Sequence, residues 1–194
     1  WFRVGGKDNP EKWKGKTLYE LYTEAFTPWE WQPKLKQLAD EIGIMLFSSP
    51  FDTTAVDFLE KMCVPCYKIA SYEVTDFLLL RKVAQTGKPV IMSVGYAPLQ
   101  EIGFALKTLR ENGAKDIAIL HCVTGYSAKP KATDMHLSTI KDMQTRFGVV
   151  GGFSDNNAGI EIPLMAIVAG ASIIEKHIIL DRKTGGPDAR FSLE

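Results

Sequence analysis

The strongest constraint on this 194-residue chain is a regular alternation of short apolar runs with helix-like segments. The six apolar runs cover residues 43–49, 66–71, 89–95, 117–125, 149–156 and 172–180. Their starts lie about 23 to 32 residues apart, the length of one strand–helix unit. Strands that are apolar on both faces and alternate with helices predict a parallel sheet covered by helices.

Helical periodicity fills the segments between the runs. We expect helices over residues 33–43, 54–62 and 99–113, because apolar side chains recur there at helical spacing. Asp52 is a typical N-cap for the second of these helices, and Gly113 is a typical stop signal for the third. The chain is therefore predicted to be an α/β protein.

The spacing alone does not separate an open doubly wound sheet from a TIM (β/α)8 barrel. No G-x-G-x-x-G or G-x-x-x-x-G-K-[ST] motif occurs, which removes the commonest nucleotide-binding open sheets. Six units are visible where a barrel needs eight. We expect residues 1–194 to be a single domain, which is partial if the fold is a barrel.

Composition excludes several classes of protein. The net charge is zero, which argues against nucleic acid and anionic membranes as partners. No apolar run approaches the roughly 20 residues of a membrane span, and the first residues are too polar for a signal peptide. With only three cysteines, we expect a cytoplasmic protein. Cys63 and Cys66 form a C-x-x-C that precedes a strand, so we interpret them as small turn residues.

Polar side chains stand at the carboxyl end of every predicted strand. The residues concerned are Ser48 and Ser49, then Lys68, Ser71 and Glu73, then Ser93, then His121, Thr124 and Tyr126, then Ser154, Asp155 and Asn156, and finally Glu175, Lys176 and His177. In parallel α/β folds ligands bind where these ends meet. The pattern predicts a small-molecule site at this edge.

The side chains suggest several kinds of chemistry. Lys68, inside an apolar strand, is a candidate anion binder or Schiff-base former, or a structural partner of Glu73 or Glu175. Glu175 and His177 share one face of their strand, because strands have period two. His177 and Asp188 have the donor groups to ligate a divalent metal or to orient a carbonyl.

Five motifs resemble the sialic acid synthase family. They are FSSPFDTTAVDFLEKMCVPCYKIASYEVTD, GKPVIMSVG, IAILHCVTGY, GFSDNNAGIEIP and IIEKHIILDRKTGGPDARFSLE, and they cover nearly the whole chain in the family's order. Within the family, GKTLYELYTEAFTPWEWQPKL and GGPDARFSL are most similar to the members that make pseudaminic acid. The resemblance implies a TIM barrel of which this chain carries strands 3 to 8.

The resemblance also implies an activity. Family members condense phosphoenolpyruvate with a six-carbon N-acetylated amino sugar, giving a nine-carbon 2-keto acid and phosphate, with the help of Mn²⁺ or Mg²⁺. Residues matching the phosphoenolpyruvate site are Ser49, Lys68, Ser71, Ser93, Thr124 and Ser154. Tyr126 and Asp188 match positions near the sugar and the metal, and Glu73 and Glu175 match polar residues of the pocket. His177 matches a metal ligand.

The departures from the family pattern leave alternatives open. Asn156 stands where most members have the second metal-binding histidine, and an amide oxygen is a weaker ligand. The family's first two barrel strands and its C-terminal antifreeze-like domain, which contributes to the family's homodimer, are not found in the sequence. The alternatives to the synthase are a non-catalytic truncated relative that binds a sugar or a partner subunit, and a Schiff-base aldolase using Lys68.

Overall fold

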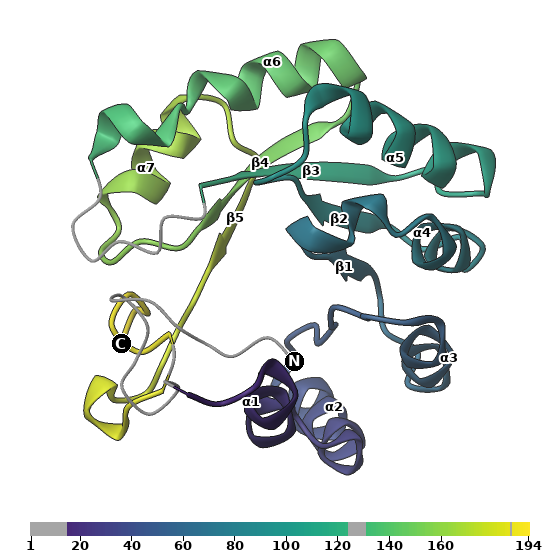
Figure 1. Cartoon of the computed structure of the whole chain (residues 1–194), viewed down its shortest axis with the longest axis vertical. Helices are drawn as coiled ribbons and strands as arrows, with labels where there is room; N and C mark the ends of the chain where they lie inside the picture. The colour runs from purple at the N-terminus through teal and green to yellow at the C-terminus, as the bar shows by residue number, and fades with distance from the viewer. Residues whose placement is uncertain (1–14, 124–130, 187) are drawn as a thin grey trace. The chain divides into compact units, whose positions relative to one another are not determined.

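The computed structural model describes residues 15–123, 131–186 and 188–194, and Figure 1 shows their arrangement. The chain divides into two compact units, residues 1–46 and residues 47–194. The prediction of a single domain over residues 1–194 stays a prediction.

The described residues of the first unit form two α-helices and a short 3₁₀ helix, Trp29–Trp31. Helix α1 (Leu18–Ala25) begins at Thr17, whose hydroxyl oxygen accepts a hydrogen bond from the Glu20 backbone N–H, while the Glu20 carboxylate accepts one from the Thr17 backbone N–H. Helix α2 (Gln32–Ile42) ends at Gly43, which has a φ of 76°. Few residues other than glycine adopt this left-handed conformation, so the sequence itself ends the helix here. The prediction of a helix over 33–43 is confirmed to within one residue.

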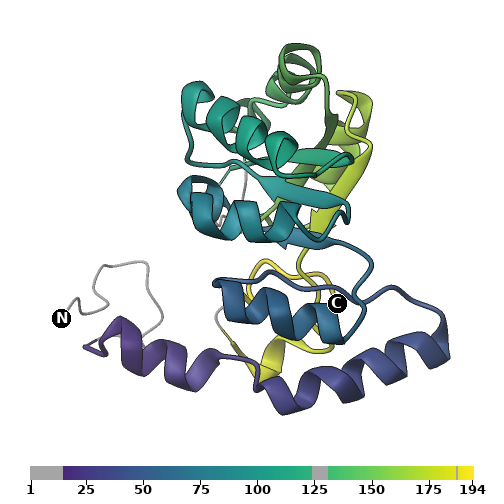
Figure 2. The same cartoon turned by 90° about the vertical axis from the view of Figure 1, so that its right-hand side faces the viewer.

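The second unit alternates strands and helices along the chain (Figures 1 and 2). The strands are β1 (Tyr67–Ile69), β2 (Val90–Ser93), β3 (Ile117–Cys122), β4 (Val150–Asp155) and β5 (Ile173–Lys176). The helices are α3 (Thr53–Lys61), α4 (Phe77–Ala84), α5 (Leu99–Glu111), α6 (Ser138–Phe147) and α7 (Glu161–Val168). Short 3₁₀ helices cover Ser71–Thr75, Ala132–Met135 and Arg182–Thr184. The predicted N-cap is confirmed, because the Asp52 carboxylate accepts from the backbone N–H groups of Thr54 and Ala55.

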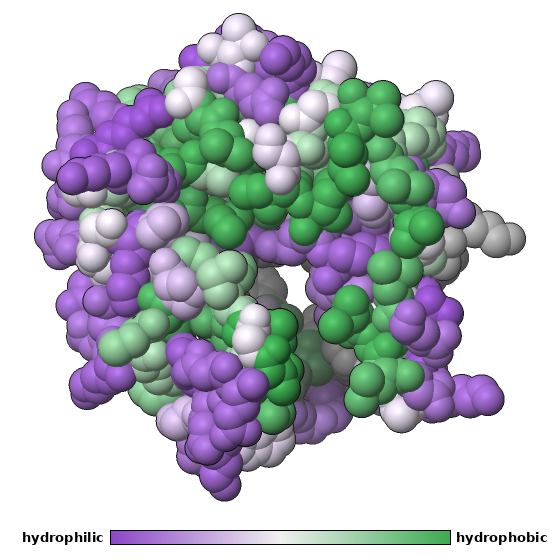
Figure 3. All heavy atoms as spheres, turned by 180° about the vertical axis from the view of Figure 1, so that it is seen from behind, coloured by the Kyte–Doolittle hydropathy of each residue, from purple (hydrophilic) through white to green (hydrophobic). Residues whose placement is uncertain are grey.

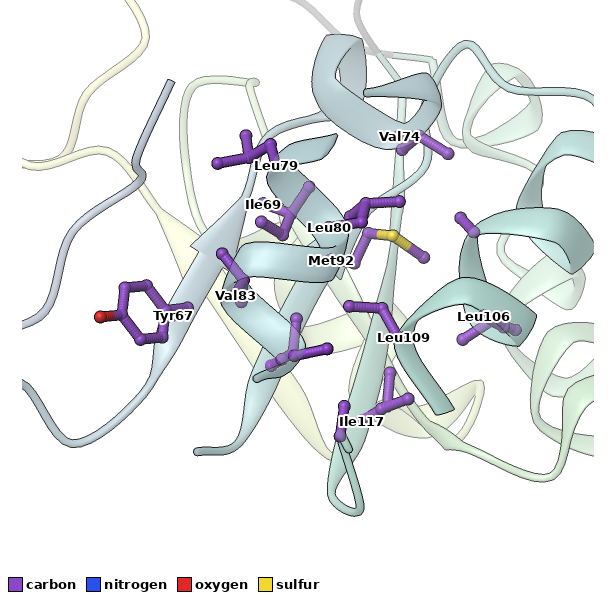
Figure 4. Packing of buried hydrophobic residues seen from close by; sticks show 14 of the residues in the cluster. Tyr67, Ile69, Val74, Leu79, Leu80, Val83, Met92, Leu106, Leu109 and Ile117 are labelled. Carbon is purple, nitrogen blue, oxygen red and sulfur yellow. The ribbon is translucent and has the colours of Figure 1, made fainter. Parts of the chain in front are cut away.

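All five strands are parallel and follow one another in the sheet in chain order, β1-β2-β3-β4-β5. One face of the sheet packs against the helices. Ile69 and Met92 on that face meet Leu80 of α4, and Leu106 and Leu109 of α5 continue the same core (Figure 4). A second, smaller core joins β4 to α6 and α7. The predicted parallel sheet is therefore confirmed.

The sheet is strongly curled. Lys68 lies on β1 and Glu175 on β5, the two outer strands of the described sheet, yet Lys68 Nζ and Glu175 Oε2 are 3.6 Å apart. In a flat sheet, four strand spacings of about 4.8 Å would hold these strands about 19 Å apart. The strands therefore form a half-barrel, and the side chains of its two edges meet across the concave face.

Two sequence predictions need correction. Residues 44–50, all within the described part of the chain, form no strand. A single backbone hydrogen bond, from Lys68 N to Ser48 O at 3.3 Å, links this segment to β1, and one bond does not make a ladder. The predicted strand over 172–180 ends at Lys176. Beyond it Ile178 and Leu180 are exposed, and only an isolated bridge pairs Ile178 with Leu193.

Helix α7 leaves much apolar surface uncovered. Leu164, Ile167 and Val168 are more than half exposed. Seen from behind, apolar side chains gather across the upper half of the surface (Figure 3). Among the described residues, no helix is both long and apolar enough to cross a membrane.

Candidate active site

The strand register assigns the polar residues to one of two faces. Lys68 aligns with Ile91, which aligns with Ala118, so Lys68 lies on the concave face, opposite the helix-packed Ile69 and Met92. Ser154 aligns with Glu175, and the close approach of Glu175 to Lys68 places this pair on the concave face as well. The carboxyl ends of the strands thus direct these candidate residues towards one space.

Lys68, Glu175 and Ser154 form the first group of the site. Lys68 is 8% exposed, and its ammonium donates a hydrogen bond to the Ile69 carbonyl oxygen at 3.0 Å. Glu175 Oε1 accepts from the Ser154 hydroxyl at 2.8 Å, while its Oε2 faces Lys68. Burial lowers the pKa of Lys68, and the negative charge of Glu175 opposes this shift. The group therefore contains a buried cation with one partly exposed counter-charge.

The next candidate residues lie at the ends of two neighbouring strands. Ser71 and Glu73 follow β1, and Ser93 is the last residue of β2. The Ser71 hydroxyl oxygen accepts a hydrogen bond from Gly95 N at 3.1 Å and so ties the ends of the two strands together. Burial raises the pKa of Glu73, and its Oε2 atom is buried. Within the part of the chain that the structure describes, Glu73 Oε2 and the buried Ser93 Oγ have no hydrogen-bond partner. A buried polar atom without a partner is costly, so both atoms are suited to meeting a ligand.

Asn156, His177 and Asp188 form the second group. His177 Nε2 lies 3.2 Å from Asn156 Oδ1, and His177 Nδ1 lies 3.5 Å from Asp188 Oδ2. The rings of His177 and Phe191 pack perpendicular to each other, edge to face, with their centres 5.1 Å apart. The imidazole is thus held on three sides, by an amide, a carboxylate and a ring.

Cys122 supports Asn156 from β3. The Asn156 amide nitrogen donates to Cys122 Sγ at 3.2 Å, which leaves its oxygen directed at His177. Burial raises the pKa of Cys122, so its sulfur stays in the thiol form at neutral pH. From the sequence alone Cys122 is interpreted as a core residue. Its position beside the S-D-N motif on the neighbouring strand is the signal that could have identified its role.

The donor chemistry of this second group fits a hard divalent ion. In the described ranges no three His, Cys, Asp or Glu side chains gather as a metal site, so the candidates are the two neutral donors Asn156 Oδ1 and His177 Nε2. Asp188 lies beside the other imidazole nitrogen, where carboxylates orient metal-binding histidines. Such a pair would leave most coordination positions to water or substrate.

The remaining predicted residues have less definite surroundings. Ser49 lies directly after Ser48, whose carbonyl oxygen accepts from Lys68 N, so it is close to β1. Thr124 and Tyr126 lie outside the described residues. His121 faces the helices, where its Nε2 atom lies 2.8 Å from the Met135 carbonyl oxygen. It therefore belongs to the packing side of the sheet, and the expectation that every polar strand end faces one site is wrong for it.

Comparison with known proteins relates the chain to one family. The model of the NeuB family matches residues 5–194. The pseudaminic acid synthase of Helicobacter pylori is 41% identical over 94% of this chain and 53% of its own length. An uncharacterized protein of Methanocaldococcus jannaschii is 42% identical over 93% of this chain and 53% of its own length. The chain thus spans about half the length of these curated relatives.

A solved structure gives the same result. The N-acetylneuraminic acid synthetase of Leptospira borgpetersenii, determined with citrate, is 34% identical and superposes with a TM-score of 0.84 over 90% of this chain and 60% of its own. The family match, the identities and this superposition agree with the motifs found along the strands. The chain belongs to the NeuB family, whose members include the sialic acid and pseudaminic acid synthases.

Proposed function

We propose that the protein condenses phosphoenolpyruvate with a six-carbon N-acetylated amino sugar, producing a nine-carbon 2-keto acid and phosphate. The observation that carries this proposal is the buried ammonium of Lys68 on the concave face of the sheet, the face on which the register also places Ser154 and the unpartnered Ser93. Phosphoenolpyruvate carries a carboxylate and a phosphate, and both groups bind well to ammonium and hydroxyl donors.

The anion site would use Lys68 with the hydroxyls of Ser71, Ser93 and Ser154, to which the family resemblance adds Ser49 and Thr124. In the free protein Glu175 accepts a hydrogen bond from the Ser154 hydroxyl and balances part of the Lys68 charge. An incoming anion would compete with Glu175 for both donors, and the released carboxylate would face the sugar. Glu175 is therefore proposed to contact the sugar, and the family resemblance adds Tyr126.

Asn156 and His177 would hold a divalent ion, Mn²⁺ or Mg²⁺, with Asp188 orienting the imidazole through Nδ1. When bound, such an ion supplies Lewis-acid activation of the aldehyde oxygen of the open-chain sugar. The contact from Cys122 keeps the Asn156 oxygen on the side of His177. These residues thus prepare the place where negative charge develops in the reaction.

The proposed reaction forms one bond between carbon 3 of phosphoenolpyruvate and the aldehyde carbon. The aldehyde oxygen takes up a proton, and water adds at carbon 2. The carbon 2–oxygen bond to phosphate then breaks as the keto group forms. Of the two protons of the added water, one replaces the proton taken up by the aldehyde oxygen and the other goes to the departing phosphate. The raised pKa of Glu73 makes its carboxyl group a suitable proton donor to the aldehyde oxygen. Lys68 stabilises the phosphate as it leaves.

We further propose that the half-barrel is part of a TIM (β/α)8 barrel, and that the full-length protein is a cytoplasmic homodimer. Both proposals rest on the family relationship. A Schiff-base aldolase is a second candidate, because burial lowers the pKa of Lys68 and so favours its nucleophilic amine form. The negative charge of Glu175 favours the ammonium form of Lys68, and this form supports the anion-binding role instead.

The direct test is turnover by the protein in its full natural length. Phosphoenolpyruvate, Mn²⁺ and a library of N-acetylated hexosamines should give phosphate and a 2-keto acid in equal amounts. Lys68→Met should abolish both products. Lys82→Met, which removes an ion pair with Asp57 on the helices, should leave them unchanged. Absence of turnover with every sugar would refute the proposal.

A further inference from the structure

Lys176 lies between two candidate site residues in sequence, yet it points to the other face of the sheet. Glu175 and His177 face the concave side, so period two directs Lys176 towards the helices. Its side chain is 10% exposed, and the carboxylate of its partner Asp155 is 0% exposed. The proposed reaction uses neither of these two buried charges.

The Lys176 ammonium connects two separate segments to β5. It donates to Asp155 Oδ2 at 2.6 Å and to the carbonyl oxygen of Asn157, both at the end of β4. It also reaches the carbonyl oxygen of Phe191 at 3.5 Å, near the C-terminal end of the described chain. An ammonium has three donor hydrogens, so a single side chain can serve all three acceptors.

These acceptors are the immediate neighbours of the proposed metal donors. Asp155 and Asn157 flank Asn156, and Lys176 itself precedes His177 in the chain. The ring of Phe191, the third acceptor, packs perpendicular to the His177 imidazole. Contacts to Lys176 therefore hold the Asp155 carboxylate on one side of Asn156 and the Asn157 backbone carbonyl on the other. They also hold the backbone of Phe191, whose ring packs on His177.

Both carboxylate oxygens of Asp155 have hydrogen-bond partners. Asp155 Oδ1, the oxygen that does not face Lys176, accepts from the backbone N–H of Asn157 at 3.3 Å and from its side-chain amide at 2.7 Å. A buried ion pair usually stabilises a fold no better than apolar residues would, but it can fix the registry of the elements that carry it. Here Asp155 aligns with Lys176 in the ladder, directly after the pair Ser154 and Glu175.

We propose that Lys176 is a positioning residue, which sets the geometry of the Asn156–His177 pair from the opposite face of the sheet. The proposal rests on the proposed function, because it takes this pair as the metal donors. It assigns the Lys176–Asp155 pair to the site and not only to the stability of the fold. Lys176 contacts neither the substrate nor the metal.

The test compares Lys176→Met with Lys88→Met in the full protein. Lys88 forms a 2.6 Å ion pair with Glu60 away from β4 and β5, so it controls for the loss of a partly buried ion pair. Metal-free protein labelled with ¹⁵N-histidine reports the His177 ring, which His177→Gln assigns. Calorimetric titration with Mn²⁺ reports the donor pair. Lys176→Met should shift the His177 signals and weaken Mn²⁺ binding about tenfold, while Lys88→Met should change neither.

A double variant separates positioning from stability. Asp155→Asn/Lys176→Met leaves no unpaired buried charge, so it should unfold at a higher temperature than Lys176→Met. It still lacks the donor to the Asn157 and Phe191 carbonyls, so the weak Mn²⁺ affinity and the shifted His177 signals should persist. If the single variant does not fold, the Mn²⁺ affinity and the His177 signals of the double variant test the positioning role.

Wild-type His177 signals and Mn²⁺ affinity in the double variant would overturn the proposal. If wild-type protein binds no Mn²⁺ but the variants shift the His177 signals, positioning is supported, and the metal step of the proposed function fails. If wild-type protein binds Mn²⁺ and the variants bind it equally well, the positioning role fails and the proposed function stands.

Discussion

Lys68 and Glu175 stand on opposite edge strands of the described sheet, and their charged atoms are 3.6 Å apart. This pair bridges the two edge strands across the concave face of the half-barrel and places a buried cation there. The cost of burying Lys68 exceeds its attraction to Glu175, because its pKa is lowered on balance. A buried charge held at a cost to the fold agrees with the proposed anion-binding role of Lys68.

Stability measurements can expose this cost. Lys68→Met should leave the free energy of unfolding unchanged or raise it by about 1 kcal/mol, because an apolar side chain replaces a poorly compensated buried charge. The same variant should lose phosphoenolpyruvate binding. Urea unfolding and calorimetry measure the two effects.

Lys176→Met is the matched control, because both lysine side chains are 10% exposed. Its partner Asp155 is completely buried, whereas the Glu175 side chain is 41% exposed. Removing Lys176 should therefore cost about 3 kcal/mol. Equal destabilisation by the two substitutions would contradict the distinction between Lys68, whose counter-charge is partly exposed, and Lys176, whose counter-charge is fully buried.

Glu73 should make stability depend on pH. Its folded-state pKa lies above the ordinary value of 4.5, so the folded chain binds more protons than the unfolded chain between these two values. Stability should therefore fall as pH rises through this window. Glu73→Gln removes the titrating group, so its melting temperature relative to wild type should rise across the window, on the order of 2 °C.

Thermal unfolding from pH 4 to pH 8 measures this difference. Leu78→Met, at an exposed position in α4 that does not titrate, is the control and should give a constant offset from wild type. A constant offset for Glu73→Gln as well would show that burial does not perturb Glu73.

Asn156→His should strengthen metal binding. Imidazole is a better ligand than an amide oxygen for Mn²⁺, so calorimetry should show affinity rising about tenfold or more. Adding His177→Gln to this variant should remove the gain, because the two donors act on one ion. Unchanged affinity in Asn156→His would mean that residue 156 is not a ligand position.

Lys68 should not form a covalent adduct. Glu175 favours the ammonium form of Lys68, so incubation with pyruvate and borohydride should leave the protein mass unchanged. A tryptic peptide containing Lys68 and heavier by one reduced pyruvate would favour the aldolase instead.

The sequence predicts much of the fold because local signals and the global fold agree. Five of the six apolar runs are strands, Asp52 caps α3 as expected, and α5 ends at Glu111, two residues before the predicted stop signal Gly113. The run over 43–49 has the apolar composition of a strand but only one ladder bond. Residues 178–180 are apolar yet mostly exposed. Hydrophobicity reports what a segment can bury, whereas strand pairing depends on neighbours that the pattern does not specify.

The site is only partly predictable for a related reason. Strand period two places Glu175 and His177 on one face, and the contacts confirm this. The approach of Lys68 to Glu175 depends on how far the sheet curls, which strand spacing alone does not fix. The roles of Cys122 and Lys176 depend on contacts between strands.

Isotopic analysis of the released phosphate tests the central claim most directly. Phosphoenolpyruvate labelled with ¹⁸O in the bridging position, mixed with full-length protein, Mn²⁺ and the reactive hexosamine, should transfer its label to phosphate, because the carbon 2–oxygen bond breaks. Mass spectrometry of the phosphate and ³¹P NMR detect it. Label retained in the keto acid, with unlabelled phosphate, would contradict the proposed reaction.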